Sequence, residues 1–257
     1  MTHLRRRVRR IRPALAIALA LGLAVPVAVA RMRGPAPSAL NVYAAVSLRE
    51  LLPQIDTGPA YNFGASNTLQ LQIERGAPAD VFASASPQEA RSLFRAGTCE
   101  RPVTFATNKL VLIVPKANPG AIRSVYTLKK GGLRLAVGNR GVPIGSYTRT
   151  LLRRLGLSNV LSTNTVSQES NVAGIVSKVA LGSADAGFVY VTDGRIASDK
   201  VTAIRLPRYA QPPVRYQICS VKRGGADSSG AASHIAKVRS DRGRGLLKAA
   251  GFGLPPK

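Results

Sequence analysis

The sequence predicts an α/β protein with a mainly parallel sheet. Short apolar segments that fit strands alternate with segments whose apolar residues recur at helical spacing. This alternation of strand and helix is typical of parallel sheets that are covered by helices. The 257 residues are enough for one large domain or two small ones, each with its own core.

The first strands and helices are expected soon after residue 39. Three segments predict strands, at residues 40–45, 61–63 and 81–83. Ser47 has the place of a helix N-cap, because Glu50 follows three residues later as in a capping box. Pro53 should shorten or kink the helix that follows. Two more helices are expected, one that ends at Gly76 and one over residues 87–96.

The same alternation continues through the second half of the chain. Apolar segments predict buried strands at residues 110–114, 133–137 and 186–191. Helices are expected over residues 145–155 and 172–182. Residues 206–221 predict two extended segments separated by a pair of prolines, and a final helix is expected over residues 231–250.

The N-terminus has the pattern of a secretory signal peptide over residues 1–30. Six arginines precede an apolar run of about 17 residues, which ends in Ala28-Val29-Ala30. Cleavage there would leave residues 31–39 as a linker and export the protein to the periplasm or the cell surface. The alternative is an uncleaved anchor, although a comfortable bilayer span needs about 20 residues.

The chain is strongly basic, with a formal net charge of +25. Loss of the signal peptide would remove six cations and no acids, leaving about +19. The Arg and Lys residues are scattered, aromatic residues make up only 5%, and Trp is absent. Because no nucleic-acid motif accompanies the charge, we expect a solvated basic surface that attracts anions, and no nucleic-acid partner.

Enzyme classes and metal sites find little support in the sequence. The only histidines are His3 and His234, and no nucleophile elbow accompanies them. Residues 138–141 do not fit a phosphate loop or a dinucleotide fingerprint. Cys99 and Cys219 form no Cys-x-x-Cys pattern, so a zinc site is not expected. We expect no enzyme, no metal and no cofactor, with an exported α/β enzyme as the alternative from another class.

Several turns deliver a small or polar residue to the start of an expected helix. These turns contain Ser47, Ser66, residues 143–145, and Asn171 with Val172. Helix N-termini expose unpaired N–H groups and partial positive charge, which makes them anion sites. In parallel α/β sheets such turns lie at the edge where ligands bind. Each feature taken alone is most simply a helix cap or a core residue.

Five segments, taken together and in this order, resemble the molybdate-binding periplasmic protein family. They are residues 44–48 (AAVSL), 63–69 (FGASNTL), 76–82 (GAPADVF), 135–138 (LAVG) and 186–190 (AGFVY). The resemblance covers roughly residues 40–257. It implies a two-lobed periplasmic-binding-protein fold of type II, in which two crossovers join lobes that each have a mainly parallel sheet. Lobe I is expected at 40–103 with 206–257, and lobe II at 104–205.

The resemblance also implies a function and a site. The chain would bind molybdate or tungstate for the permease subunits of an ABC importer, as a monomer, with sulfate or phosphate as the alternative ligands. Ser47 and Ser66 would offer hydroxyl and backbone N–H donors, Ile144 and Val172 backbone N–H donors, and Tyr190 its phenol. No charged side chain would touch the anion.

The expected lobes also bear on the two cysteines. Export permits a disulfide, but sequence alone leaves the pairing open. Cys99 lies just before the first expected crossover and Cys219 after the return. Both would then lie on the side of lobe I, and we expect one disulfide between them.

Overall fold

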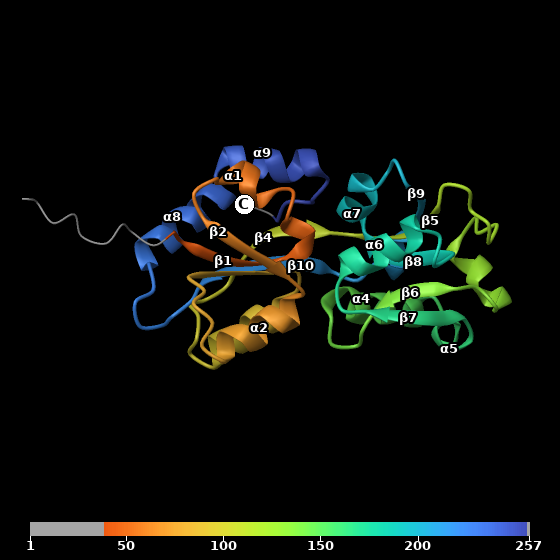
Figure 1. The fold of residues 1–257 in the computed structure, drawn as a ribbon, viewed down its shortest axis with the longest axis horizontal. Helices are drawn as coiled ribbons and strands as arrows, with labels where there is room; N and C mark the ends of the chain where they lie inside the picture. Colours follow the sequence, from red (N-terminus) through yellow and green to blue (C-terminus); the bar gives the residue numbers. More distant parts are fainter. Residues whose placement is uncertain (1–38, 256–257) are drawn as a thin grey trace, which may run out of the picture. The chain divides into compact units, whose positions relative to one another are not determined.

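The computed structural model describes residues 39–255, except for the side chains of residues 165 and 166 (Figure 1). The expected signal peptide at residues 1–30 and the linker up to residue 38 lie outside the described residues. The described chain contains two five-stranded sheets with the same internal order of parallel and antiparallel pairs.

The first sheet has the strand order β2-β1-β3-β10-β4. Its strands are β1 (Asn41–Ala45), β2 (Ala60–Gly64), β3 (Val81–Ser84), β4 (Val103–Asn108) and β10 (Val214–Ser220). Strand β1 runs parallel to β2 and β3, whereas β10 is antiparallel to β3 and β4. The carboxyl ends of the three parallel strands therefore meet at one edge.

The second sheet repeats this arrangement in the order β7-β6-β8-β5-β9. Its strands are β5 (Leu110–Pro115), β6 (Leu135–Gly138), β7 (Thr165–Glu169), β8 (Ala186–Tyr190) and β9 (Val201–Arg205). Strands β6, β7 and β8 are parallel, and β5 is antiparallel to β8 and β9. Every residue of β5 and β8 is buried, which fits strands covered on both faces.

Helices cover both faces of the first sheet (Figure 1). They are η1 (Val46–Leu48), α1 (Leu52–Ile55), α2 (Ser66–Glu74), α3 (Pro87–Arg95), α8 (Ser228–Arg239) and α9 (Asp241–Ala250). Helices α2 and α3 pack together on one face, and α1 packs with α8 and α9. Local sequence explains the start of α3, because Ser86 caps it through Gln88 N–H and Pro87 opens its first turn.

The second sheet is also covered on both faces, by α4 on one and by α6 with α7 on the other (Figure 1). The helices of this half are η2 (Val125–Lys130), α4 (Pro143–Arg154), α5 (Val160–Asn164), α6 (Val172–Ala180) and α7 (Val191–Ile196). A short helix, η3 (Arg208–Ala210), lies in the return connection to β10. The apolar faces of these helices and strands form one continuous core.

The two-lobed α/β fold is confirmed, with two differences in its sheets. Each sheet is mixed rather than mainly parallel, because the connections β4–β5 and β9–β10 insert antiparallel strands. Strand β4 pairs with β10 as far as Asn108. The chain therefore leaves the first sheet at Lys109, not after residue 103 as expected.

Three local expectations also need correction. Ser47 is not a helix cap: it lies inside η1, and no side chain caps that helix. Helix α1 has only 4 residues, with Pro53 in its first turn, which agrees with the shortening expected at Pro53. Residues 206–221 contain one strand, preceded by η3. The expected last helix is two helices, because the Ser240 hydroxyl accepts a hydrogen bond from Gly243 N–H and starts a new one.

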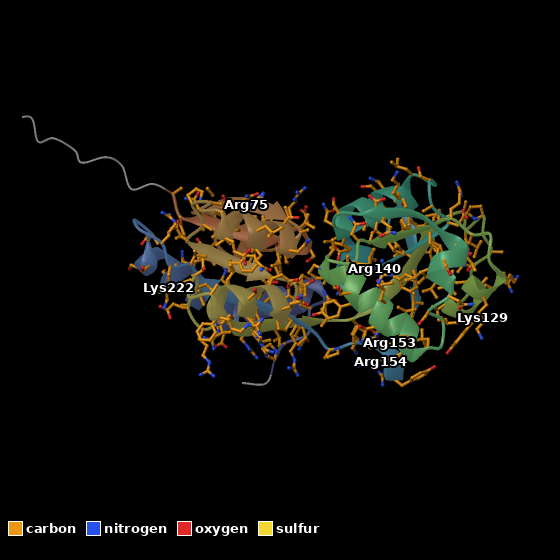
Figure 2. The ribbon with its side chains drawn as sticks, turned by 90° about the horizontal axis from the view of Figure 1, so that it is seen from below. Arg75, Lys129, Arg140, Arg153, Arg154 and Lys222 are labelled. Atoms are coloured by element: carbon orange, nitrogen blue, oxygen red, sulfur yellow. A yellow bond between two sulfur atoms is a disulfide. The ribbon has the colours of Figure 1, made fainter. Side chains whose placement is uncertain are left out.

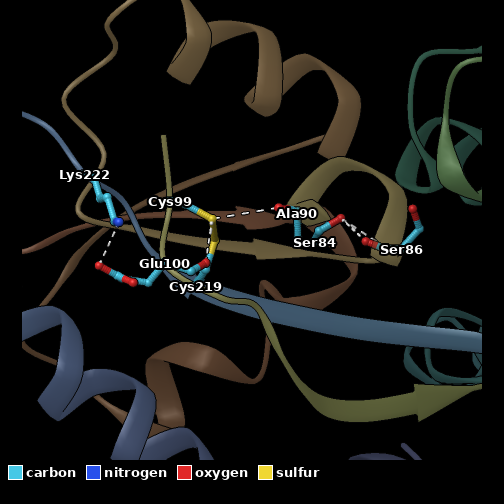
Figure 3. The surroundings of a disulfide bond; sticks show 7 residues. All are labelled: Ser84, Ser86, Ala90, Cys99, Glu100, Cys219 and Lys222. Atoms are coloured by element: carbon cyan, nitrogen blue, oxygen red, sulfur yellow. Dashed lines mark hydrogen bonds and ion pairs between the residues drawn. A yellow bond between two sulfur atoms is a disulfide. The ribbon is translucent and has the colours of Figure 1, made fainter. Parts of the chain in front are cut away.

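Figure 3 shows the disulfide that joins Cys99, in the segment after α3, to Cys219 on β10 of the first sheet. Their Cα atoms lie 6.1 Å apart, within the range that disulfides span. Both cysteines are buried in a small cluster with Phe82 and Leu93. An ion pair between Lys222 and Glu100, with atoms 3.1 Å apart, lies beside the bridge.

Candidate functional site

A small cavity lies where the carboxyl ends of parallel strands from both sheets meet helix starts. Its lining includes residues that end or follow the strands β1, β2, β3, β6, β7 and β8. They are Ala45, Val46, Ser47, Gly64, Ala65, Ser66, Ala85, Val142, Pro143, Ile144, Asn171, Val172 and Tyr190. The centres of water-sized spheres can occupy about 20 Å³ of it, which suits one small ion rather than a large organic ligand. The structure thus brings all five residues expected at the site to one cavity.

Two serines that follow strands of the first sheet, Ser47 and Ser66, line the cavity with their hydroxyls held by hydrogen bonds. The Ser66 oxygen accepts a hydrogen bond from the Ala85 N–H at 3.0 Å. The Ser47 oxygen lies 3.0 Å from the Tyr216 phenol oxygen. Both serines are buried, with 1% and 5% exposure for Ser66 and Ser47. Because the Ser66 oxygen accepts from a backbone N–H, the Ser66 hydrogen is left for another acceptor, whereas either hydroxyl of the Ser47–Tyr216 pair can donate to the other.

Tyr190 is the most conspicuous polar group in the lining. It ends β8 and is 2% exposed, and its phenol oxygen has no hydrogen-bond partner among the described residues. Burial, followed by the nearby Tyr216, raises the pKa of Tyr190 well above its ordinary value. The phenol is therefore a protonated donor without an acceptor, a state that costs free energy unless a ligand relieves it.

Two helix starts of the second half supply backbone donors. Val172 is the first residue of α6, and the Asn171 side chain that caps this helix accepts from Gly174 N–H at 3.1 Å. The cap therefore leaves the Val172 N–H unused. Ile144 is the second residue of α4, after Pro143, which has no N–H to offer. The N–H groups of such first turns have no partner within their own helix.

Close contact between β6 and α4 fixes the direction of the second helix start. A Cβ atom on Gly145 would lie 2.0 Å from the Asn139 carbonyl oxygen, and one on Gly138 would lie 2.7 Å from the Gly145 nitrogen. From outside, the Arg149 guanidinium donates to the carbonyl oxygens of Gly138 and Gly145, both at 2.9 Å. The helix start is thereby tied to the strand end, without room for a side chain between them.

No Lys or Arg of the described chain lines the cavity. Arg149 stands behind the turn, and burial, followed by the charge of Arg140, lowers its pKa. The exposed cations labelled in Figure 2 are spread along the chain, from Arg75 at the end of α2 and Lys129 of η2 to Lys222 after β10. The positive potential at the cavity therefore comes from helix starts and polar hydrogens, with the basic surface further away.

Three buried polar residues near the site were missed from the sequence. Tyr216 and Asn108 lie on the two strands next to the connections between the sheets, and residue type alone gives no signal for their role. Asp193, in the first turn of α7, has a buried oxygen without a partner in the described chain. Its place three residues after the helix cap Tyr190 is a capping pattern that could have drawn attention to it.

The family model for bacterial extracellular solute-binding proteins matches residues 59–253 of this chain. The chain belongs to this family. The resemblance noted from the sequence is thus confirmed at the level of the whole fold, including both halves that line the cavity.

Several relatives of this solute-binding protein are themselves named for molybdate. The molybdate-binding protein ModA of Mycobacterium tuberculosis is 36% identical over 234 residues, which are 86% of this chain and 88% of that protein. ModA of Haemophilus influenzae is 29% identical over 84% of this chain and 91% of that protein. The solved periplasmic molybdate-binding protein of Azotobacter vinelandii is 26% identical, has a TM-score of 0.75, and matches 84% of this chain and 100% of its own.

The fold is shared more widely than the sequence. The sulfate-binding protein SubI of Mycobacterium tuberculosis has a TM-score of 0.72 at 14% identity, which shows a common fold alone.

Among residues 39–255, no helix has both the length and the apolar character of a membrane span. In the same part of the chain no group of His, Cys, Asp and Glu side chains is arranged to hold a metal ion.

Proposed function

We propose that this solute-binding protein binds molybdate, and also tungstate, outside the cytoplasm and delivers it to the permease subunits of an ABC importer. The observation that carries the proposal is the buried Tyr190 phenol, which lines the cavity as a donor without an acceptor. The similarity to proteins named for molybdate binding supports the choice of ligand.

A cavity of neutral donors suits a doubly charged tetrahedral oxyanion. The hydroxyls of Ser47 and Ser66, the N–H groups of Ile144 and Val172, and the phenol of Tyr190 would converge on four oxygens. Each hydrogen bond to a charged acceptor contributes about 1.5–3 kcal/mol. Several such bonds, together with helix N-termini, can balance a dianion. Release breaks no buried ion pair, which is an advantage for a protein that must give up its ligand.

The same donors explain the expected selectivity. Near neutral pH molybdate and tungstate carry no proton, whereas phosphate keeps at least one. In the proposed arrangement all five groups donate to the anion, so the proton of phosphate would stay unpaired or one hydroxyl would have to give up its donated bond. Sulfate carries no proton but is smaller, and it cannot reach all donors at good distances.

Calorimetric titration of the exported domain with molybdate, tungstate, sulfate and phosphate tests the proposal. Molybdate and tungstate should bind with comparable affinity, and each far more tightly than sulfate or phosphate. Phosphate or sulfate binding equal to that of molybdate would contradict the proposal. The purified protein should bind its ligand as a monomer, which light scattering during the same titration would establish.

The proposal includes no chemical step and no cofactor. The matched family consists of solute-binding proteins, so capture and release are sufficient for the function. The strongly basic surface would speed the encounter with an anion, and this effect should weaken with salt because exposed charges are screened over about 10 Å at 0.1 M ionic strength.

A further inference from the structure

The buried carboxyl group of Asp193 is not explained by the proposed anion site. Asp193 stands in the first turn of α7, three residues after Tyr190, and is 9% exposed. Its carboxyl oxygen Oδ2 is buried and has no hydrogen-bond partner among the described residues. A negative charge is costly there, because that oxygen has lost water and gained no donor. Burial accordingly raises the pKa of Asp193 to about 7.

Asp193 lies next to the proposed anion site. It lines a second cavity, together with residues of α6 and of the turn that contains η1. Val46 and Ser47 line both this second cavity and the cavity of the proposed anion site. The two cavities therefore share a wall, with Asp193 in the lining of one and Tyr190 in the lining of the other.

The charge of Asp193 acts on the phenol that lines the anion site. Burial is the main cause that raises the pKa of Tyr190, and the charge of Asp193 adds to it. A negatively charged Asp193 therefore opposes negative charge at the Tyr190 phenol. A dianion that accepted a hydrogen bond from this phenol would meet the same repulsion, with two charges instead of one.

The other charged groups around Asp193 are exposed. Helix α7 packs against α6, β5, β8 and β9, and the turn at residues 46–50 lines the cavity with it. The charged residues of these elements other than Asp193 are Arg49, Glu50, Lys178, Arg195 and Arg205, all exposed. Water and salt screen such charges. Tyr190, the other titratable residue of these elements, stays neutral because burial above all raises its pKa well beyond the ordinary value.

We propose that Asp193 is a proton-binding site coupled to the anion site, so that the protein takes up a proton from the solvent together with its anion. This inference rests on the proposed function and deepens it, because it adds a second bound ion. The field of the dianion makes the carboxylate form of Asp193 less favourable, and a proton binds there. The linkage is reciprocal, so the protonated protein binds the anion more tightly than the deprotonated one.

Calorimetry in buffers with different enthalpies of ionisation counts the protons taken up. Molybdate carries no proton near neutral pH, so any proton bound during the titration belongs to the protein. The parent should take up about 0.3–0.5 proton per molybdate at pH 7, because about half of the Asp193 side chains carry a proton before the anion binds. From pH 6 to pH 8 the affinity should weaken roughly threefold to tenfold.

Two variants assign the proton to a residue. Asp193→Asn keeps the size of the side chain and removes its titration, so uptake should fall below about 0.1 proton and the affinity should be nearly constant from pH 6 to pH 8. Glu50→Gln is the matched control, since Glu50 lines the same cavity but is exposed, and it should behave as the parent. Circular dichroism checks that both variants fold. If Asp193→Asn does not fold, carbon-13 NMR of the parent decides, because the pKa of the Asp193 carboxyl should be higher with molybdate than without it.

The outcomes separate this inference from the proposed function. Tight molybdate binding by the parent without proton uptake would overturn the inference and leave the proposed function intact. Uptake that persists in Asp193→Asn, or that disappears in Glu50→Gln, would also overturn the inference. If sulfate proves to be the tightest ligand, the molybdate assignment fails, but proton uptake with sulfate still decides the role of Asp193. A parent that binds neither molybdate, tungstate, sulfate nor phosphate overturns both.

Discussion

An apolar residue can serve an anion site through its backbone alone, and we propose Val172 as the example in this protein. Its side chain packs in the core, with 4% exposure, while its N–H opens helix α6 at the cavity. The preceding residue, Asn171, is extended, with φ −159° and ψ 173°. This conformation is compatible with a proline at position 172, and proline is well tolerated as the first residue of a helix.

Two substitutions at this position therefore distinguish the contribution of the Val172 side chain to binding from that of its backbone N–H. Val172→Ala should bind molybdate nearly as tightly as the parent, because the N–H remains. Val172→Pro should lose about 1.5–3 kcal/mol of binding, since it deletes a donor to a charged acceptor. Calorimetry measures both, after circular dichroism has shown that the proline variant folds. Equal affinity of the two variants would rule out the backbone donor.

The buried Asp193 should make the stability of the protein depend on pH. Burial raises its pKa to about 7, although hydrogen bonds from its own N–H, from Tyr190 N–H and from Thr192 lower it. Between the ordinary carboxyl pKa and about 7 the unfolded chain has lost this proton and the folded protein keeps it. The contribution of Asp193 to stability should therefore fall as pH rises through this window, and become constant above it.

Asp193→Asn should remove this dependence. The free energy of unfolding of the parent, relative to that of Asp193→Asn, should fall with pH by up to about 1.4 kcal/mol per unit below pH 7. Urea unfolding at several pH values measures it. The exposed Asp199 supplies the control, because the free energy of unfolding of Asp199→Asn should change with pH in the same way as that of the parent. If the parent instead gains stability relative to Asp193→Asn as pH rises, the predicted direction of the pH dependence is wrong.

At the scale of elements, the contact between β6 and helix α4 determines where the Ile144 donor points. Gly145→Ala would place a methyl group 2.0 Å from the Asn139 oxygen, so the helix start must move. We expect a loss of stability on the order of 1–3 kcal/mol and weaker molybdate binding. Gly245→Ala in α9 is the control, since nothing lies within 4 Å of its added methyl group and it should stabilise by about 0.4–1 kcal/mol. Thermal unfolding and calorimetry of both variants would check these effects.

The disulfide makes a second prediction at this scale. It connects the segment after α3 with β10 and closes a loop of 120 residues. Mass spectrometry of the unreduced protein should find no free thiol. Reduction should lower the free energy of unfolding by a few kcal/mol, while a Cys99→Ala/Cys219→Ala variant should not respond to reductant. Two free thiols in the exported protein would contradict the pairing.

The sequence predicts elements well where pattern and local signals agree. The buried strands at β3, β5 and β8 and the helices α2, α3 and α6 appear where apolar periodicity placed them. Strands β4, β7 and β9 were not predicted. The residues of β4 and β9 are only partly buried, so their apolar pattern is weak. Ser47 was misjudged because its hydrogen-bond partner, Tyr216, lies 169 residues away, beyond the reach of any local pattern.

At the scale of the whole molecule, the cavity draws its residues from two groups of strands. Ser47 and Ser66 follow strands of the first sheet. Ile144, Val172 and Tyr190 follow or end strands of the second sheet. The two groups belong to the two lobes of the fold, and we propose that the chain passes between the lobes at Lys109 and in the segment 206–213. Such lobes close around a ligand by rotation at a hinge.

Ligand-driven closure predicts a change in size. Small-angle scattering should show a smaller radius of gyration with saturating molybdate than without it. Sulfate at the same concentration serves as the control for ionic strength. A radius that stays constant at saturation would show that the lobes are already closed before the anion arrives.

The division of the donors between two sheets also decides how the anion can leave. A pocket built around a buried cation would hold its anion until some other ion took its place. Here the separation of the sheets removes either the two hydroxyls of Ser47 and Ser66 or the three donors of Ile144, Val172 and Tyr190 in one movement. If the proposed donors hold the anion, opening of the two halves is then sufficient for release, and no competing ion is needed. A transport partner that pulls the halves apart could empty the site at any concentration of competing anions.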